Sequence, residues 1–125
     1  MRLLLDTHVF LWAVAGSASL NAKMRKTIDT AEAVFVSAAS IWEIAINARL
    51  RKIDADPAAL VAAIDESGFI ELPLRAMHAA RVATLPPIHA DPFDRLLVAQ
   101  AIAEPLRLLT TDAKLKAYGE LVAVI

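Results

Sequence analysis

The chain has 125 residues, of which 58% are apolar, and its acidic and basic side chains nearly cancel to a formal charge of −1. This length fits one domain with a single core, and the charge excludes a polybasic nucleic-acid binder. The absence of cysteine excludes disulfides, thiolate metal sites and cysteine nucleophiles. No apolar run reaches the roughly 18–20 residues that span a bilayer, and Asp6 interrupts the apolar N-terminus before a signal-peptide core forms. We therefore expect a cytoplasmic protein without membrane contact.

The first half of the chain alternates short apolar runs with helical patterns. In chain order we expect a strand at residues 3–5, helices at 8–15 and 21–30, a strand at 33–37, and helices at 40–49 and 56–66. Gly16-Ser17 closes the first helix, and Asp56-Pro57 is typical of a helix start. The two helices that follow the second strand are expected to form a small projection.

The second half continues the alternation. We expect a strand at residues 69–72, helices at 76–85 and 91–104, a strand at 107–110, a short helix at 112–118 and a strand at 121–125. This order predicts an α/β domain with a central, mostly parallel sheet of about five strands and helices on both faces. No repeat or long linker is visible, so residues 1–125 are expected to form one domain. The three glycines leave no phosphate-binding loop.

The apolar fraction exceeds the roughly 45–50% of ordinary globular chains. An alanine-rich, tightly packed core is one explanation. An apolar surface kept for a partner protein or a second copy is another, and the sequence leaves both open.

Four carboxylates stand where an apolar run gives way to a helix, or one turn into that helix: Asp6, Glu43, Asp94 and Asp112. In an open α/β sheet those positions share one edge, so the four side chains are expected to converge in one crevice. Clustered carboxylates repel one another, and a hard divalent cation such as Mg²⁺ or Mn²⁺ relieves that repulsion. The set therefore predicts metal-assisted hydrolysis of phosphodiester bonds.

Each acid also has a purely structural interpretation. Asp6 is in an ordinary helix N-cap position, and Ser40 with Glu43 fits a capping box. Asp91 precedes Pro92 as an N-cap, and the remaining acids can stabilise a first helical turn. Taken singly, each acid is explained by capping. Their joint placement after apolar strands favours the catalytic interpretation.

Neighbouring side chains are candidates for supporting roles in water, carboxylate or phosphate binding: Thr7, Ser40, Arg95, Thr110 and Thr111. Arg95, next to Asp94, is the best-placed single cation for a phosphate. Asp91 is a further candidate ligand beside the four acids.

The histidines and tryptophans give weaker signals. The three histidines lack metal-ligand spacing. His78 is expected to be packed or exposed, and His89 to contact substrate or shape its loop. Trp12 and Trp42 are expected in the core or an interface rather than as base-stacking platforms. The basic residues at 49–52 are interpreted either as a solvated helix end or as an RNA-backbone contact.

Four segments together resemble PIN-domain proteins, most closely the VapC-type ribonuclease toxins of prokaryotic toxin–antitoxin pairs. They are Leu-Leu-Leu-Asp-Thr-His at residues 3–8, Val-Ser-Ala-Ala-Ser-Ile-Trp-Glu at 36–43, Asp-Pro-Phe-Asp-Arg at 91–95 and Leu-Leu-Thr-Thr-Asp at 108–112. The resemblance covers essentially the whole chain in the right order. Asn47 and the residues after it depart from the lysine and glycine-lysine pattern of that family, which affects substrate contacts from this helix rather than the metal site.

The resemblance implies a three-layer PIN-like fold and a Mg²⁺- or Mn²⁺-dependent endoribonuclease. By position, Asp6, Glu43, Asp94 and Asp112 correspond to the family's metal-binding acids, and Asp91 to an accessory acidic position. The family further implies a homodimer silenced by a cognate antitoxin protein. Two alternatives remain open: a non-catalytic PIN-like binding protein, and a receiver-type phosphoacceptor domain, although a lone acid after the first strand fits the latter poorly.

Overall fold

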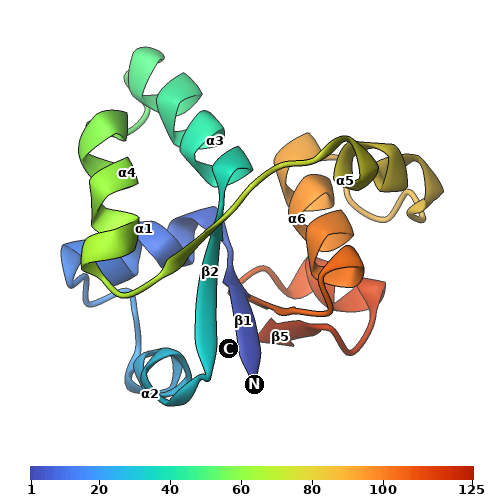
Figure 1. Ribbon diagram of the computed structural model, residues 1–125, viewed down its shortest axis with the longest axis horizontal. Coiled ribbons are helices and arrows are strands. Elements are labelled where there is room, and N and C mark those ends of the chain that lie inside the picture. The colour runs from blue at the N-terminus through green and yellow to red at the C-terminus, as the bar shows by residue number, and fades with distance from the viewer.

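A parallel sheet lies between two layers of helices in the computed structural model, which describes residues 1–125 (Figure 1). Its strands follow the order β3-β2-β1-β4-β5, and every neighbouring pair is parallel. The strands are β1 (Arg2–Leu5), β2 (Ala33–Ser37), β3 (Ile70–Leu72), β4 (Arg107–Thr110) and β5 (Val122–Val124). The predicted α/β class and five-stranded sheet are confirmed, and the sheet is wholly rather than mostly parallel.

Strand β1 lies at the centre of the sheet and is buried on both faces. Leu3 and Leu5 belong to the apolar cluster on one face and Leu4 to the cluster on the other, and all three are fully buried. Successive side chains of a strand point to opposite faces, so three consecutive leucines supply both halves of the core.

Helices cover the two faces in sequence order. They are α1 (Thr7–Ala15), α2 (Ala22–Thr30), α3 (Ala38–Arg49), α4 (Pro57–Glu66), α5 (Ala76–Arg81) and α6 (Pro92–Ala103), with 3₁₀ segments η1 (Val82–Thr84) and η2 (Ala113–Tyr118). The first four contribute to the core cluster on one face, and α6 and η2 to the cluster on the other. Figure 1 shows α3 and α4 extending together beyond the strands, as expected of the small projection predicted from the sequence. None of the helices has the length and apolarity needed to cross a membrane.

The start of α3 differs from the prediction. The helix begins at Ala38, directly after β2, and Ser37 caps it by accepting a hydrogen bond from the amide of Ala39. Ser40 therefore lies inside the helix, so the capping-box interpretation of Ser40 and Glu43 was wrong. The other differences are small: the helix predicted at 76–85 turns into 3₁₀ geometry at Val82, and the one at 112–118 is entirely 3₁₀.

The connections after the strands set the position of the site. Only Asp6 separates β1 from α1, and no residue separates β2 from α3. Parallel strands end at one edge of the sheet, so these short junctions bring Asp6, α3 and the residues after β4 to the same edge.

Candidate active site

A hollow of about 350 Å³ lies at this edge of the sheet. Nine residues line it: Asp6, Thr7, His8, Trp12, Glu43, Asp91, Asp94, Thr111 and Asp112. The structure thus brings together the four predicted acids, the accessory Asp91, and two of the predicted supporting threonines. We call this hollow the acidic pocket.

Asp6 combines a capping role with a place in the pocket. Its Oδ1 accepts a hydrogen bond from the amide of His8 at 2.8 Å, which caps α1, and its Oδ2 accepts one from the Thr110 hydroxyl at 2.7 Å. The residue is buried. The capping interpretation is therefore confirmed, and the carboxylate keeps lone pairs for a further ligand, so the metal-binding interpretation remains a prediction.

Glu43 projects from α3 and is fixed by the first turn of α1. The Thr7 hydroxyl lies 2.6 Å from Oε1 of Glu43 and 2.9 Å from Oγ of Ser40. Because Thr7 has one hydroxyl proton, it donates to the carboxylate and accepts from Ser40. Burial raises the pKa of Glu43, as do the nearby carboxylates of Asp91 and Asp6, against the opposing effect of the Thr7 hydrogen bond.

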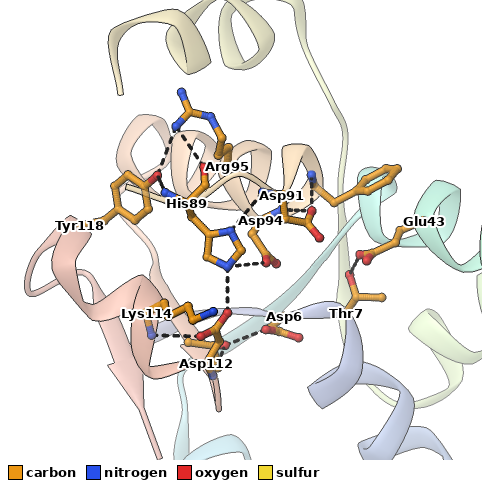
Figure 2. A network of polar contacts seen from close by, with 12 residues as sticks. Asp6, Thr7, Glu43, His89, Asp91, Asp94, Arg95, Asp112, Lys114 and Tyr118 are labelled. Carbon is orange, nitrogen blue, oxygen red and sulfur yellow. Dashed lines mark hydrogen bonds and ion pairs between the residues drawn. The ribbon is translucent and has the colours of Figure 1, made fainter. Parts of the chain in front are cut away.

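Asp91 and Asp94 sit at the start of α6 (Figure 2) and differ in their hydrogen bonds. Oδ1 of Asp91 accepts from the amides of Phe93 at 2.8 Å and Asp94 at 3.2 Å, which confirms its prediction as an N-cap. Asp94 points into the pocket, and burial together with the carboxylates of Asp91 and Asp6 raises its pKa to about 7.

Asp112 is joined to His89 on the other side of the pocket. Its Oδ2 lies 3.0 Å from Nε2 of His89, and its Oδ1 accepts from the amide of Lys114 at 2.9 Å. Burial opposes ionisation of Asp112, but the hydrogen bonds from His89 and from the Lys114 amide outweigh it and lower the pKa of the carboxyl below its ordinary value.

The donor set of the acidic pocket fits a hard divalent cation. Five carboxylates share one hollow that contains neither lysine nor arginine. The raised pKa values of Glu43 and Asp94 reflect this uncompensated negative charge as well as burial. Carboxylate oxygens are among the ligands that Mg²⁺ and Mn²⁺ prefer.

Arg95 is not brought to the pocket, contrary to its prediction as the best-placed cation for a phosphate. Its guanidinium points away from the acids and donates to the backbone carbonyls of Val82, Pro86 and His89 and to the Tyr118 hydroxyl (Figure 2). Arg95 therefore connects η1 and the loop before α6 to the start of that helix instead of facing the acids.

The basic residues of the projection also lie outside the pocket. Arg49, Arg51 and Lys52 are exposed at the far end of α3 and just beyond it. Asn47, on the same helix, does not line the pocket either. The contact of this segment with RNA remains a prediction.

Sequence reasoning underrated the aromatic side chains. Trp12 was expected in the core or an interface; it packs against the core and also lines the acidic pocket, beside His8. Trp42 is 57% exposed, with its ring against Phe93 at 5.2 Å between centroids, so it is no core residue. His78 is packed as expected, fully buried with Nε2 2.7 Å from Glu104.

His89 was given no definite role from the sequence, yet it is central to the network in Figure 2. Its side chain contacts Asp112 and lies 3.5 Å from Oδ2 of Asp94. The signal available in the sequence was its position two residues before Asp91, the cap of α6.

Comparison with known proteins agrees with this geometry. The model of the PIN domain family matches residues 3–121, so the chain belongs to the PIN-domain family. A search of curated proteins finds no match.

Solved structures with the same fold include several toxin–antitoxin assemblies. A toxin–antitoxin complex from Klebsiella pneumoniae is 18% identical with a TM-score of 0.71, and covers 98% of this chain and 96% of its own. VapBC2 from Rickettsia felis, bound to a DNA fragment from its promoter, is 16% identical with a TM-score of 0.68, covering 100% and 98%. VapC20 from Mycobacterium tuberculosis, described as a toxin that cleaves the sarcin-ricin loop, is 17% identical with a TM-score of 0.60, covering 94% and 95%.

Proposed function

We propose that this protein is a divalent-metal-dependent endoribonuclease and the toxin of a toxin–antitoxin pair. The observation that carries the proposal is the convergence of five carboxylates in one pocket, with the pKa of Asp94 raised to about 7. Such a pocket is electrostatically unfavourable without a cation. Membership of the PIN-domain family and the toxin–antitoxin neighbours support the choice of ribonuclease and toxin.

The acids of the pocket would bind the metal ion, and neighbouring hydroxyl groups hold two of the acids in position. Asp6, Glu43, Asp94 and Asp112 would hold Mg²⁺ or Mn²⁺, with Asp91 as a further acid of the pocket. When bound, the ion lowers the pKa of water and stabilises negative charge at the scissile phosphate. Thr7 fixes Glu43, and Thr110 fixes Asp6, so that two of the acids are held in place before a ligand arrives. Thr111, which lines the pocket, is proposed to contact water or substrate.

A protein partner fits the surface next to this site. Trp42 and Leu50 are each 57% exposed on and just after α3, and with Ala45, Ile46 and Arg49 they border a largely apolar hollow. Exposed apolar groups of this kind mark protein interfaces. We propose a cognate antitoxin and a homodimer as partners, in a cytoplasmic setting where RNA is available. Co-purification with the product of an adjacent small reading frame tests the antitoxin, and light scattering tests the dimer.

The decisive experiment is cleavage of total cellular RNA by purified, antitoxin-free protein, with Mg²⁺ or Mn²⁺ against EDTA. The Asp6→Asn variant should be inactive. Glu66→Gln, which removes an exposed acid at the end of α4 far from the pocket, should retain full activity. Discrete fragments that require both the metal and Asp6 would support a site-selective ribonuclease and give the target by end mapping. Folded protein that cleaves nothing with either metal would favour a non-catalytic PIN-like binding protein instead.

A further inference from the structure

The imidazole of His89 is held from both of its nitrogen atoms. Nδ1 lies 3.1 Å from the backbone nitrogen of Asp91, which donates its proton to it. Nε2 lies 3.0 Å from Oδ2 of Asp112 and 3.5 Å from Oδ2 of Asp94. The side chain is 16% exposed, so its ring has little freedom to turn.

These contacts fix the tautomer of His89. A backbone amide can only donate, so Nδ1 must offer a lone pair and cannot carry a proton. The ring proton then resides on Nε2, where it points at Asp112 and Asp94. His89 therefore presents a hydrogen-bond donor, and no lone pair, to the acidic pocket.

This tautomer decides between two roles for His89. The donor atoms of His89, Asp94 and Asp112 lie within 4.8 Å of one another, which by distance alone is compatible with a metal-binding group of three. A nitrogen that carries a proton cannot coordinate a cation, because its lone pair is used. We propose that His89 is a positioning residue that orients Asp112 by donating from Nε2, and is not a ligand of the metal. This inference rests on the proposed function.

A second network holds the His89 loop in place. The amide of His89 donates to the Tyr118 hydroxyl at 3.1 Å, and Arg95 donates to that hydroxyl and to the carbonyl of His89. The Tyr118 hydroxyl in turn donates to the carbonyl of Pro86 at 3.2 Å. Arg95 and Tyr118 do not line the acidic pocket. They act on it indirectly, because they hold His89 in place.

The tautomer can be read directly by long-range ¹H–¹⁵N correlation spectra of the wild-type protein. The His89 signals are assigned by comparison with the His89→Gln variant. We expect an unprotonated Nδ1 and a protonated Nε2 in the metal-free protein, unchanged when Mg²⁺ is added. A proton on Nδ1, or loss of the Nε2 proton on adding Mg²⁺, would overturn the proposal.

Variants test the consequence for metal binding and catalysis. His89→Leu removes the donor, while His89→Gln keeps an N–H group on a side chain of similar reach. We expect His89→Leu to lower kcat about 10–100-fold, as is common for groups that orient metal ligands, with partial recovery in His89→Gln. Mn²⁺ affinity, measured by calorimetry, should change much less than kcat in both variants. Equal loss of Mn²⁺ affinity in both would instead identify His89 as a ligand.

Tyr118→Phe gives an independent measurement should His89→Leu fail to fold. It removes the hydroxyl that supports the loop and leaves every pocket residue intact. We expect a lower kcat with unchanged Mn²⁺ affinity, and unchanged kcat would contradict the supporting role. If the wild type cleaves no RNA, the proposed function fails, and the spectra and the Mn²⁺ affinities still decide the role of His89.

Discussion

Thr110 donates its hydroxyl proton to Oδ2 of Asp6 across 2.7 Å, and so joins the ends of two adjacent strands that are 104 positions apart in the sequence. The same hydroxyl oxygen accepts a hydrogen bond from the amide of Asp112 at 3.0 Å. One buried side chain therefore fixes one acid of the pocket directly and sets the backbone of another.

Replacing Thr110 by valine keeps the shape and removes both hydrogen bonds. We expect the rate of RNA cleavage to fall about 10–100-fold and the free energy of unfolding to fall by about 1–3 kcal/mol, because the partly buried amide of Asp112 loses its partner. Thr110→Ser keeps the hydroxyl and should retain most of the activity. Cleavage kinetics and urea denaturation check both expectations, and a fully active valine variant would show that the hydroxyl has no role in the site.

Neutralising Asp94 should stabilise the protein when no metal is present. Its raised pKa means that the ionised carboxylate is unfavourable in the fold, and one unit of pKa corresponds to about 1.4 kcal/mol. We expect Asp94→Asn to raise the free energy of unfolding in EDTA at pH 8, by about 2–4 kcal/mol on this scale, and to abolish cleavage.

Asp91→Ala is the contrasting control for Asp94→Asn. It also removes a carboxylate from the pocket, but it leaves two amides of α6 without their cap. Loss of an N-cap costs about 1 kcal/mol, which opposes the relief of repulsion. If Asp94→Asn instead lowers the free energy of unfolding, the Asp94 carboxylate stabilises the metal-free helix, and the prediction is wrong.

Stability without metal should fall as the pH rises from about 4 to about 7. The pKa of Asp94 in the folded protein, about 7, lies above its ordinary value of 3.8. Between these values the folded state binds the proton more tightly than the unfolded state, so its contribution is complete below the lower value and lost above the upper one. Urea titrations in EDTA across this range measure the slope. The slope should be shallower in Asp94→Asn, and equal slopes would contradict the assignment to Asp94.

Added Mg²⁺ should reverse this loss. A ligand that binds only the folded state stabilises it by about 2.7 kcal/mol at one hundred times its Kd. The proton on Asp94 must leave before that carboxylate binds a cation, so affinity should increase toward pH 8 and binding should release protons. Calorimetry in two buffers of different ionisation enthalpy measures the release. Binding that is independent of pH would exclude Asp94 as a ligand.

A buried polar network outside the pocket should matter for stability alone. Gln100 of α6 accepts a hydrogen bond from Ser37 at the end of β2 and donates to the carbonyl of Pro73 at 3.2 Å. Gln100→Ala leaves these groups unpaired and opens a cavity, so we expect a loss of about 2–4 kcal/mol. Gln100→Glu, by contrast, keeps the size of the side chain and the oxygen that accepts the hydrogen bond from Ser37. Thermal melts give the loss, and Mn²⁺ affinity of the folded alanine variant should remain that of the wild type.

The positions of the acids were predictable because they depend on chain order. A strand that ends at Leu5 and a helix that follows must put Asp6 at the edge where parallel strands end. Chain order also predicted the parallel sheet, and residue types predicted a helix start at Asp56-Pro57 and an N-cap at Asp91; the structure confirms all three. The role of Asp6, Glu43, Asp94 and Asp112 in catalysis remains a prediction.

The orientation of Arg95 and the contacts of His89 were not predictable in this way. They depend on where the carbonyls of η1 and of the loop before α6 lie, and on where Tyr118 of η2 packs against that loop. The start of α3 was misplaced for a related reason: Ser37 and Ser40 are equally good caps by residue type. The strand was predicted at its observed bounds, and the error was to leave a gap before the helix, which in the structure follows β2 directly with Ser37 as its cap.

The two sides of the acidic pocket are connected to the regular elements of the fold by segments of very different length. Asp6 directly follows β1, and Glu43 lies on α3, which begins directly after β2. His89 and Asp91 instead belong to the stretch between η1 and α6, which has no regular secondary structure. Insertions and substitutions are tolerated far better in such a stretch than between a core strand and its helix. Related chains can therefore vary the part of this segment that precedes His89, while the half of the pocket that is anchored in the sheet stays the same.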